Sequence, residues 1–435
     1  MTAHSIAQPL AYRRTFLLFL AAYPVLWVLG LAYFMWPLIA IGFVLALAGR
    51  RPVRVSPGFG LWVLFLIWML ASATELSSGQ RYLLFSWRAV IYLTATALFL
   101  WVYNASEDEL PADAVARALT ALFAVAVFCG VLGVIDPTAS MDSLAQHLLP
   151  RSWLSNTTAY AYVHPALAQI QFKALGHPIG RPMAPFAYTN QWAATVGVLM
   201  PFAVITTLRS RPGVRRHALV GLLALSVVPI VVSLNRGLWI ALGVALVYAC
   251  VRLAAIGYRR QLSVALMAVA VIAVGVAISP LGSLVQSRVG SEHSSNSTRA
   301  SLYQQSFAGV ASSPLLGYGS PQPSTSGGTG AARVGTQGQF YLILVSHGIP
   351  GIVFYLGWFV FTFLHALRRR TVDEVLWSSV LVISFVEMMV YDFLPLTIYV
   401  IVVACALLWR ARIRRPQPVR STAAAMPRSL VRATS

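Results

Sequence analysis

Arginines are the residues of this sequence best suited to chemistry on a charged substrate, because carboxylates are scarce. The chain has 12 Asp and Glu residues against 32 Lys and Arg residues. A Mg²⁺ or Mn²⁺ ion on a diphosphate is normally held by paired carboxylates. The acidic residues outside the segments that we assign to the inner side of a membrane form no such close pair; they are Glu75, Asp136, Asp142, Glu292, Glu387 and Asp392. The planar fork of arginine can supply the counter-charge instead, so we expect a site without a metal and without any other cofactor.

Arg236 is the first candidate for this role. It lies in Ser233-Leu-Asn-Arg-Gly-Leu-Trp239, at a very short turn between two apolar runs. A lone arginine at a membrane boundary is usually an anchor whose charged end reaches the interface. On the outer side of a membrane, however, the usual distribution of positive charge disfavours arginine. A binding role and an anchoring role therefore both stay open for Arg236.

Arg299 is the second candidate for this role, and Arg181, Asn190 and Glu387 are further polar residues that could take part in a site. Arg299 lies at the predicted start of a helix in a long outer loop, where backbone N–H groups and a guanidinium can bind an anion together; a solvated arginine is the alternative. Arg181 precedes an apolar run and Asn190 begins it. Both could contact the same anionic group of a substrate, or serve as an interfacial residue and a helix cap.

Glu387 lies within an apolar run, where an ionisable group is costly, so we expect it to pair with an arginine.

The chain that carries these residues has the composition of a membrane protein. It is 58% hydrophobic and 10% charged, with a mean hydropathy of +0.72. A soluble domain of this length keeps far more charge on its surface. The long apolar runs predict an all-α polytopic membrane protein with about 12 transmembrane helices. The predicted spans are 15–32, 34–49, 59–77, 87–104, 115–135, 189–208, 217–234, 237–254, 262–280, 349–367, 375–394 and 396–411.

The arginines also predict the orientation of these spans. Several runs of arginine lie in short loops and in the C-terminal tail, which fall on one side when the spans alternate, and the positive-inside rule then places both termini in the cytoplasm. These inner arginines are Arg50, Arg51, Arg54, Arg209, Arg211, Arg215, Arg216, Arg259, Arg260, Arg368, Arg369, Arg370, Arg410, Arg412, Arg414 and Arg415. Because they follow apolar runs and do not line one soluble face, we expect no nucleic-acid partner. Three cysteines lie inside apolar runs and are expected to be free, small buried residues; they are Cys129, Cys250 and Cys405.

Two outer stretches are too long and too polar to be simple connectors. Long loops in compact proteins are usually functional or disordered. The predicted organisation is N-terminal transmembrane helices at 1–135, a periplasmic loop at 136–188, central transmembrane helices at 189–280, a large periplasmic loop with active-site elements at 281–348, C-terminal transmembrane helices at 349–411 and a basic cytoplasmic tail at 412–435.

Several motifs, in their order and spacing, resemble the O-antigen ligase and polymerase superfamily, most closely the lipopolysaccharide O-antigen ligases. Ser233-Leu-Asn-Arg236-Gly resembles the Ser-Arg-Gly turn of that family. Arg299, Tyr303 and Pro314-Leu-Leu-Gly-Tyr-Gly319 resemble its loop arginine and the turn that follows. Gln339-Phe-Tyr-Leu-Ile-Leu-Val-Ser-His-Gly-Ile-Pro-Gly351 resembles the segment after its catalytic histidine. The resemblance covers roughly residues 180–360, and the N-terminal spans match only in general character.

One position departs from the family pattern, which runs His-Asn-x-Phe/Tyr-Leu and then Gly-x-x-Gly. Counting back from Gly348 and Gly351 places that histidine at Gln337. A glutamine can hydrogen-bond a sugar hydroxyl but cannot take its proton at neutral pH. His347 lies about 15 Å further along a helix and is no obvious substitute. Three alternatives stay open: the chain works without a side-chain base, another histidine approaches, or the chain is an inactivated variant.

The resemblance implies a membrane glycosyltransferase similar to the GT-C class, in the inner membrane of a Gram-negative bacterium. The donor would be a glycan on undecaprenyl diphosphate, and the acceptor a sugar hydroxyl of lipid A–core oligosaccharide. Arg236, Arg299 and Gln337 would be the catalytic residues. The expected substrate-binding residues are Arg181, Asn190, Tyr318 and His347. An O-antigen polymerase and a protein O-oligosaccharyltransferase are alternatives with the same chemistry, and a lipid-linked-sugar transporter is an alternative of another class. The sequence does not indicate an oligomeric state.

Overall fold

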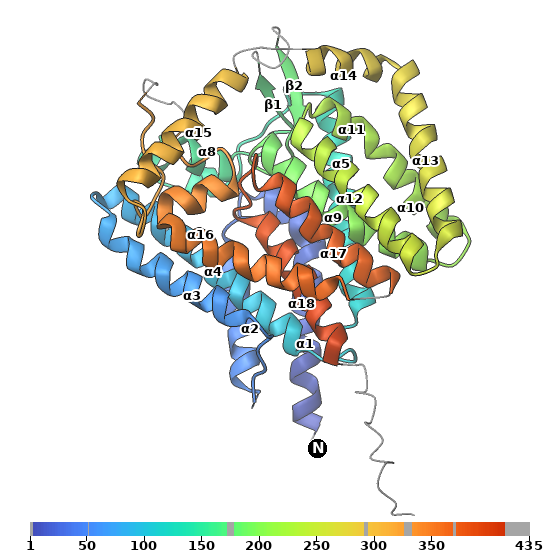
Figure 1. The fold of residues 1–435 in the computed structure, drawn as a ribbon, viewed down its shortest axis with the longest axis horizontal. Coiled ribbons are helices and arrows are strands. Elements are labelled where there is room, and N and C mark those ends of the chain that lie inside the picture. Colours follow the sequence, from blue (N-terminus) through green and yellow to red (C-terminus); the bar gives the residue numbers. More distant parts are fainter. Residues whose placement is uncertain are drawn as a thin grey trace, which may run out of the picture.

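The computed structural model describes residues 3–50, 52–171, 178–290, 295–325, 333–368 and 371–413, and these residues are predominantly helical (Figure 1). Among them, six helical segments are long and apolar enough to cross a membrane. They are α4 (Gly79–Asn104), α5 (Ala112–Ile135), α9 (Thr189–Arg209), the consecutive α10 (Val214–Leu225) and α11 (Val227–Val232), α12 (Arg236–Ala255) and α16 (Gln339–Ala366).

The other helices are shorter, bent or less apolar. Helices α13 (Arg259–Ile278) and α14 (Pro280–Gly290) meet at 89° and make a seventh candidate span if counted together. The remaining long helices are α1 (Ala3–Val28), α2 (Met35–Ala48), α3 (Phe59–Ala71, followed by a 3₁₀ turn at Ser72–Glu75), α15 (Ser295–Ser312), α17 (Val372–Glu387) and α18 (Leu396–Ile413). This architecture is consistent with the predicted polytopic membrane protein. The count of about 12 transmembrane helices stays a prediction.

Helix α9 occupies the centre of the bundle. It has the most buried apolar window of the six segments, at 78%. Trp192, Val196 and Phe202 are fully buried on it. Gly197 allows α17 to approach closely, because a Cβ atom there would lie 2.6 Å from Oε1 of Glu387. The close packing of α9 fixes the two ends of this helix: Thr189 at its start contacts Asn235, and Arg209 lies at its other end.

The loops predicted to lie on the inner side meet at one end of the bundle, which we call the short-loop end. Three arginines of the described residues join them through ion pairs with four carboxylates. Arg50 pairs with Glu109 at 3.0 Å, and Arg410 pairs with Glu107 at 3.2 Å. Arg209, at the end of α9, contacts Asp113 of α5 and Asp373 of α17. The acidic segment that follows α4 thus partners arginines of its own end. Which side of the membrane this end faces stays a prediction.

The predicted outer loops gather at the opposite end, which we call the long-loop end and which lies toward the top of Figure 1. It carries α6 (Leu144–Leu148), α7 (Arg151–Leu154), α8 (Thr157–Val163), and the antiparallel strands β1 (Ala168–Gln171) and β2 (Ile179–Pro182), in which Gln169 faces Arg181. The loop is tied to the bundle where the amide of Ala145 donates to the carbonyl of Leu29 at 3.1 Å.

Helix α16 begins ten residues before the predicted span at 349–367. Its first amides find acceptors outside the helix, since Gln339 donates to the carbonyl of Tyr391 and Phe340 donates to that of Met388. The predicted start coincides with a break at Gly348, whose φ is +68°. The polar residues before this break lower the mean hydropathy of the segment, and the predicted span therefore begins after it. The segment is nevertheless helical and buried.

The prediction that Glu387 pairs with an arginine is wrong. Both carboxylate oxygens are buried, and neither has a hydrogen-bond partner among the described residues. Oε1 faces Gly197, next to the apolar side chains of Leu238 and Ile383. The surroundings of Glu387 are therefore apolar. The three cysteines are free as predicted; Cys405 is buried, and Cys129 and Cys250 are partly buried.

Candidate functional site

The turn between α11 and α12 presents Arg236 at the long-loop end, as the sequence predicts. It consists of Ser233, Leu234 and Asn235, and Leu234 adopts a positive φ of 54°. The side chain of Ser233 donates to the carbonyl of Ile230 at 2.7 Å. Asn235 is buried and donates to the carbonyl of Thr189 at 3.2 Å. The turn is thus fixed to the start of α9, and α12 begins at Arg236, which is half-buried.

Arg181 holds this turn from strand β2. Its guanidinium donates to the carbonyl of Ser233, to the side-chain oxygen of Asn235 at 2.6 Å and to the side chain of Gln171. The side chain is buried, and burial, together with the positive charges of Arg288 and Arg299, lowers the pKa of Arg181 to about 10. It therefore stays protonated at neutral pH. The donors of Arg181 are directed at protein atoms, which is the geometry of a residue that positions the turn.

Arg288 lies close enough to interact with both Arg236 and Arg299. It lies on α14 and donates to the carbonyl of Leu234 at 3.4 Å. It interacts electrostatically with Arg236 and with Arg299, the latter in the first turns of α15. The sequence analysis did not single out Arg288, although it is an arginine on the arginine-poor side and could have been found on that ground. We call Arg181, Arg236, Arg288 and Arg299 the arginine cluster.

Tyr391 connects the arginine cluster to the start of α16. It lies in the loop between α17 and α18, and its hydroxyl accepts a hydrogen bond from the amide of Leu238 at 3.3 Å. It interacts electrostatically with Arg181 and Arg299. Its carbonyl accepts from the amide of Gln339 at 2.8 Å. One residue thus contacts the helix that begins at Arg236 and the helix that follows Gln337.

Gln337 lies in the turn before α16, in a buried and incompletely bonded position. Its side-chain nitrogen donates to the carbonyl of Arg333 at 3.0 Å and to the hydroxyl of Thr336 at 3.2 Å. Its side-chain oxygen is buried and has no hydrogen-bond partner among the described residues. Gly338 follows it, and a Cβ atom there would lie 2.6 Å from the carbonyl oxygen of Met388. The acceptor atom of Gln337 therefore has unused hydrogen-bonding capacity, in a position that is closed to solvent in this structure.

The sequence analysis passed over three more arginines: Arg81, Arg88 and Arg333. Arg333 accepts a hydrogen bond from Gln337 through its carbonyl and interacts electrostatically with the other two. Arg81, on the first turn of α4, donates to the hydroxyl of Ser320 at 2.9 Å and to the carbonyl of Tyr318. Arg88, two turns further along, interacts electrostatically with Asp392 and Arg333, and its Nη1 atom is buried without a hydrogen-bond partner among the described residues. These side chains add positive charge between α4 and the start of α16.

His347 and Tyr318 lie away from the arginine cluster, in the packing around the break in α16. His347 is buried, and its Nδ1 lies 2.7 Å from the hydroxyl of Ser72. The amide of Tyr318 donates to the carbonyl of Val345 at 3.0 Å, and its hydroxyl donates to the carbonyl of Gly309 at 3.0 Å. Asn190 lies half-buried in the first turn of α9. A substrate-binding role for these three residues stays a prediction.

Among the described residues, no group of three His, Cys, Asp or Glu side chains converges in a way that could hold a metal ion. The polar side chains that gather at the long-loop end are mainly arginines, with tyrosine, glutamine and asparagine beside them. Such an arrangement is suited to a large anion, because guanidinium groups bind phosphate oxygens through paired N–H donors.

The fold and this site define a class of protein: a multi-pass helical membrane protein with a cationic site at one end of its bundle. Residues 221–356 match the family model described as O-antigen ligase. Over these residues the chain is similar to the O-antigen ligase and polymerase superfamily, in agreement with the sequence motifs. The matched segment runs from α10 into α16 and includes Arg236, Arg288, Arg299 and Gln337. No curated protein matches the chain. The family supports a ligase- or polymerase-type function in O-antigen biosynthesis, with lipid-linked glycan substrates.

Proposed function

We propose that the protein is an O-antigen ligase that transfers a glycan from undecaprenyl diphosphate to a sugar hydroxyl of lipid A–core oligosaccharide. Transfer would occur at the periplasmic face of the inner membrane, without a metal ion. The observation that carries this proposal is the position of Arg288, which donates to the carbonyl of Leu234 beside Arg236 and interacts electrostatically with both Arg236 and Arg299. Three guanidinium groups held together repel one another, and a diphosphate between them would offset that repulsion.

The reaction would be a single displacement at the anomeric carbon. The acceptor hydroxyl forms a bond to this carbon on the face opposite the diphosphate, so the configuration inverts. The bond from the carbon to the diphosphate oxygen breaks, and the diphosphate leaves with the electron pair. Positive charge from Arg236, Arg288 and Arg299 stabilises the leaving group as its negative charge grows. The hydroxyl proton passes to water, because glutamine cannot accept it.

Gln337 would orient the acceptor in this scheme. Its side-chain oxygen has no hydrogen-bond partner among the described residues, and a sugar hydroxyl is a suitable donor. The amide nitrogen is held by Arg333 and Thr336, which keeps the side chain in one orientation. Orientation of the reacting hydroxyl lowers the activation barrier even where no side chain takes the proton.

The test is a transfer assay with purified full-length protein in lipid nanodiscs, undecaprenyl-diphosphate-linked glycan and one of three acceptors. Glycosylation of lipid A–core supports the ligase. Elongation of a second lipid-linked glycan identifies a polymerase, and modification of a pilin-like protein identifies a protein O-oligosaccharyltransferase. Movement of the donor across the bilayer without any new glycosidic bond would identify a transporter and overturn the proposal.

A further inference from the structure

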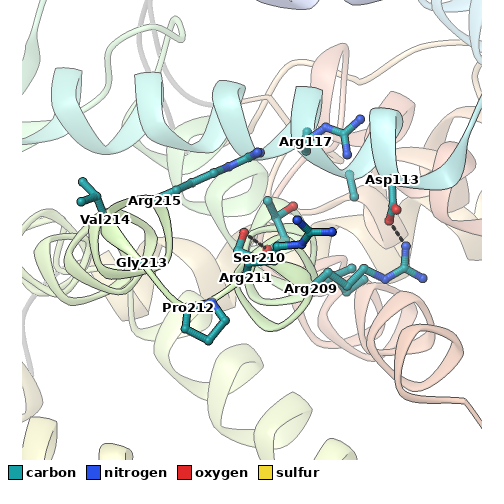
Figure 2. Close-up of a pocket in the computed structure, with 12 residues that line it drawn as sticks. Asp113, Arg117, Arg209, Ser210, Arg211, Pro212, Gly213, Val214 and Arg215 are labelled. Carbon is teal, nitrogen blue, oxygen red and sulfur yellow. Dashed lines mark hydrogen bonds and ion pairs between the residues drawn. The ribbon is translucent and has the colours of Figure 1, made fainter.

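A second cationic site lies at the short-loop end, at the far end of α9 from the arginine cluster. It is a cavity of about 460 Å³ between the start of α5, the end of α9 and the segment that leads into α10. The lining includes Asp113 and Arg117 from α5, Arg209 from α9, and Arg211 and Arg215 from the α9–α10 connection and the first turn of α10 (Figure 2). Its volume falls in the range of small-molecule sites, about 300–1,000 Å³.

Only one of the four arginines in this cavity has carboxylate partners among the described residues. Arg209 contacts Asp113 and Asp373, as the dashed line to Asp113 in Figure 2 indicates, and so joins α5, α9 and α17. Arg117, Arg211 and Arg215 make no ion pair and no side-chain hydrogen bond within the described part of the chain. Their side chains are exposed to the cavity and to its opening. The cavity therefore holds three positive charges that the protein does not neutralise.

These three charges come from different elements and converge on one space. Arg117 projects from the first turns of α5, and Figure 2 shows Arg215 extending toward α5 from the opposite wall. Simple positive-inside anchors point outward to lipid headgroups or water and need no shared cavity. A group that carries two or three anionic oxygens can contact guanidinium groups from both walls at once, as phosphate does.

Exposed apolar side chains lie beside the cavity. Val214, next to Arg215, has 87% of its surface exposed, and Leu208, next to Arg209, has 47% exposed. On the same α10–α11 segment, Val220 is 51% exposed. A free phosphate ion would make no use of this apolar surface. A phospholipid would place its headgroup in the cavity and its acyl chains along α10.

We propose that this cavity binds the phosphate headgroup of an anionic phospholipid at the short-loop end of the bundle. Basic pockets between transmembrane helices are known to suit such headgroups. The bound phosphate would contact Arg117, Arg211 and Arg215, offset part of their charge and connect α5 to α10 across the cavity, next to the junction of α5, α9 and α17 that Arg209 makes. The site is separate from the arginine cluster and does not depend on the proposed transferase function.

The test uses native mass spectrometry of the full-length protein in neutral detergent. Dioleoylphosphatidylglycerol and dioleoylphosphatidylcholine are titrated separately, and inorganic phosphate and glycerol 3-phosphate serve as competitors. The site variant carries Arg117→Gln, Arg211→Gln and Arg215→Gln. The matched control carries Arg13→Gln, Arg14→Gln and Arg54→Gln, which remove the same charge from the same end outside the cavity. Arg211→Gln alone is a second test, because Arg211 lies in a connecting segment and its removal leaves every described contact intact.

We expect phosphatidylglycerol to bind the unaltered protein at least about tenfold more tightly than phosphatidylcholine, and the site variant to lose this preference. The control should keep it, and Arg211→Gln should weaken it about threefold. Equal binding of both lipids, or an equal loss in the control, would overturn the proposal. If inorganic phosphate displaces the lipid as well as unlabelled phosphatidylglycerol does, the cavity takes a free phosphate, and the lipid assignment is wrong.

Discussion

The backbone amide of Gln339 donates a hydrogen bond to the carbonyl oxygen of Tyr391, 2.8 Å away. This bond fixes the start of α16 to the loop between α17 and α18. The hydroxyl of the same tyrosine accepts from Leu238 in the first turn of α12. Tyr391, through its hydroxyl and its backbone carbonyl, therefore helps to fix the position of Arg236 relative to Gln337. The proposed donor and acceptor sides of the reaction would share this support.

Arg288 provides the most direct test of the arginine cluster. We expect Arg288→Ala to reduce glycan transfer at least about tenfold, as the loss of a charged contact to the leaving group costs roughly 1.5–3 kcal/mol. Arg236→Ala and Arg299→Ala should have effects at least as large. Initial rates with purified protein at saturating donor measure this. Arg151→Ala, an exposed arginine of α7 at the same end, is the control and should retain normal transfer. Near-normal rates in all three cluster variants would remove the diphosphate clamp.

Gln337→His should raise the rate of transfer if position 337 faces the acceptor hydroxyl. A histidine there can take the proton that glutamine cannot, and general-base catalysis typically contributes about 10²–10⁴-fold. The rate should then increase with pH as the new imidazole loses its proton near pH 6.5. The control is Gln337→Asn, which keeps an amide and should gain nothing. A Gln337→His rate equal to that of the unaltered protein at every pH would show that the position is aligned incorrectly.

Arg181→Lys should weaken both the fold and the reaction. A lysine cannot reproduce the three hydrogen bonds to Ser233, Asn235 and Gln171, and the loss of such buried bonds costs about 2–4 kcal/mol. We expect a lower melting temperature and a reduced transfer rate, because the turn that carries Arg236 is no longer held. A melting temperature equal to that of the unaltered protein would contradict this structural role.

Arg181 also predicts a response to alkaline pH. Burial is the main cause that lowers its pKa from the ordinary value of an arginine to about 10. Between these values the unfolded chain binds more protons than the folded chain at this residue, so this group makes the fold more stable as pH rises. The charge of Arg181 itself is lost over the same interval. Without this charge the turn that carries Arg236 is held less firmly, so short assays should show that donor binding falls above about pH 10, before the protein unfolds. The fall in donor binding should be smaller in Arg181→Gln, which has no charge to lose at this position.

Gly348→Ala should damage the protein at the break in α16. Gly348 has a φ of +68°, and a Cβ atom there would collide with the carbonyl oxygen of Leu315. The strain costs about 1–3 kcal/mol before the collision is counted. We expect a lower melting temperature and loss of transfer. Gly243→Ala on α12 is a matched control, since no atom lies within 4 Å of its added Cβ; it should leave both unchanged or slightly raise stability.

Metal independence is tested by removal. We expect transfer to continue at its full rate after dialysis against EDTA, because the leaving diphosphate is stabilised by arginines. The control is a metal-dependent glycosyltransferase treated in the same way. Loss of activity that added Mg²⁺ restores would show that a cation completes the site.

The sequence was sufficient to predict most helices and the turn that carries Arg236, because long apolar runs and short polar breaks are local features. It also grouped the loops by end, since arginines mark one set of them. The start of α16 could not be predicted in the same way. Its polar residues Gln339 and His347 are satisfied by partners distant in sequence, namely Tyr92, Tyr391 and Ser72.

The site was predicted in part for the same reason. Arg236 and Arg299 lie in recognisable motifs, whereas Arg288 has no motif and is identified only by its position beside Leu234 and the other arginines. Glu387 was misassigned because its place in an apolar run indicates a partner without showing which side chains lie across the interface. The packing of Gly197 against α17 determines which groups lie beside Glu387, and those nearest to this contact are the apolar side chains of Leu238 and Ile383.

Because α13 and α14 meet at 89°, we expect the rate of the proposed glycan transfer to depend on the thickness of the bilayer. Helix α13 exposes Met267, Val271 and Ile278 to its surroundings, so we expect lipid to contribute to its depth in the membrane. Its 20 residues match a hydrocarbon layer of about 30 Å. Arg288 is carried on the arm that follows, whereas Arg236 is anchored in the bundle. Thinner or thicker membranes would therefore shift one cation vertically against the other, and turnover should peak at a particular acyl-chain length.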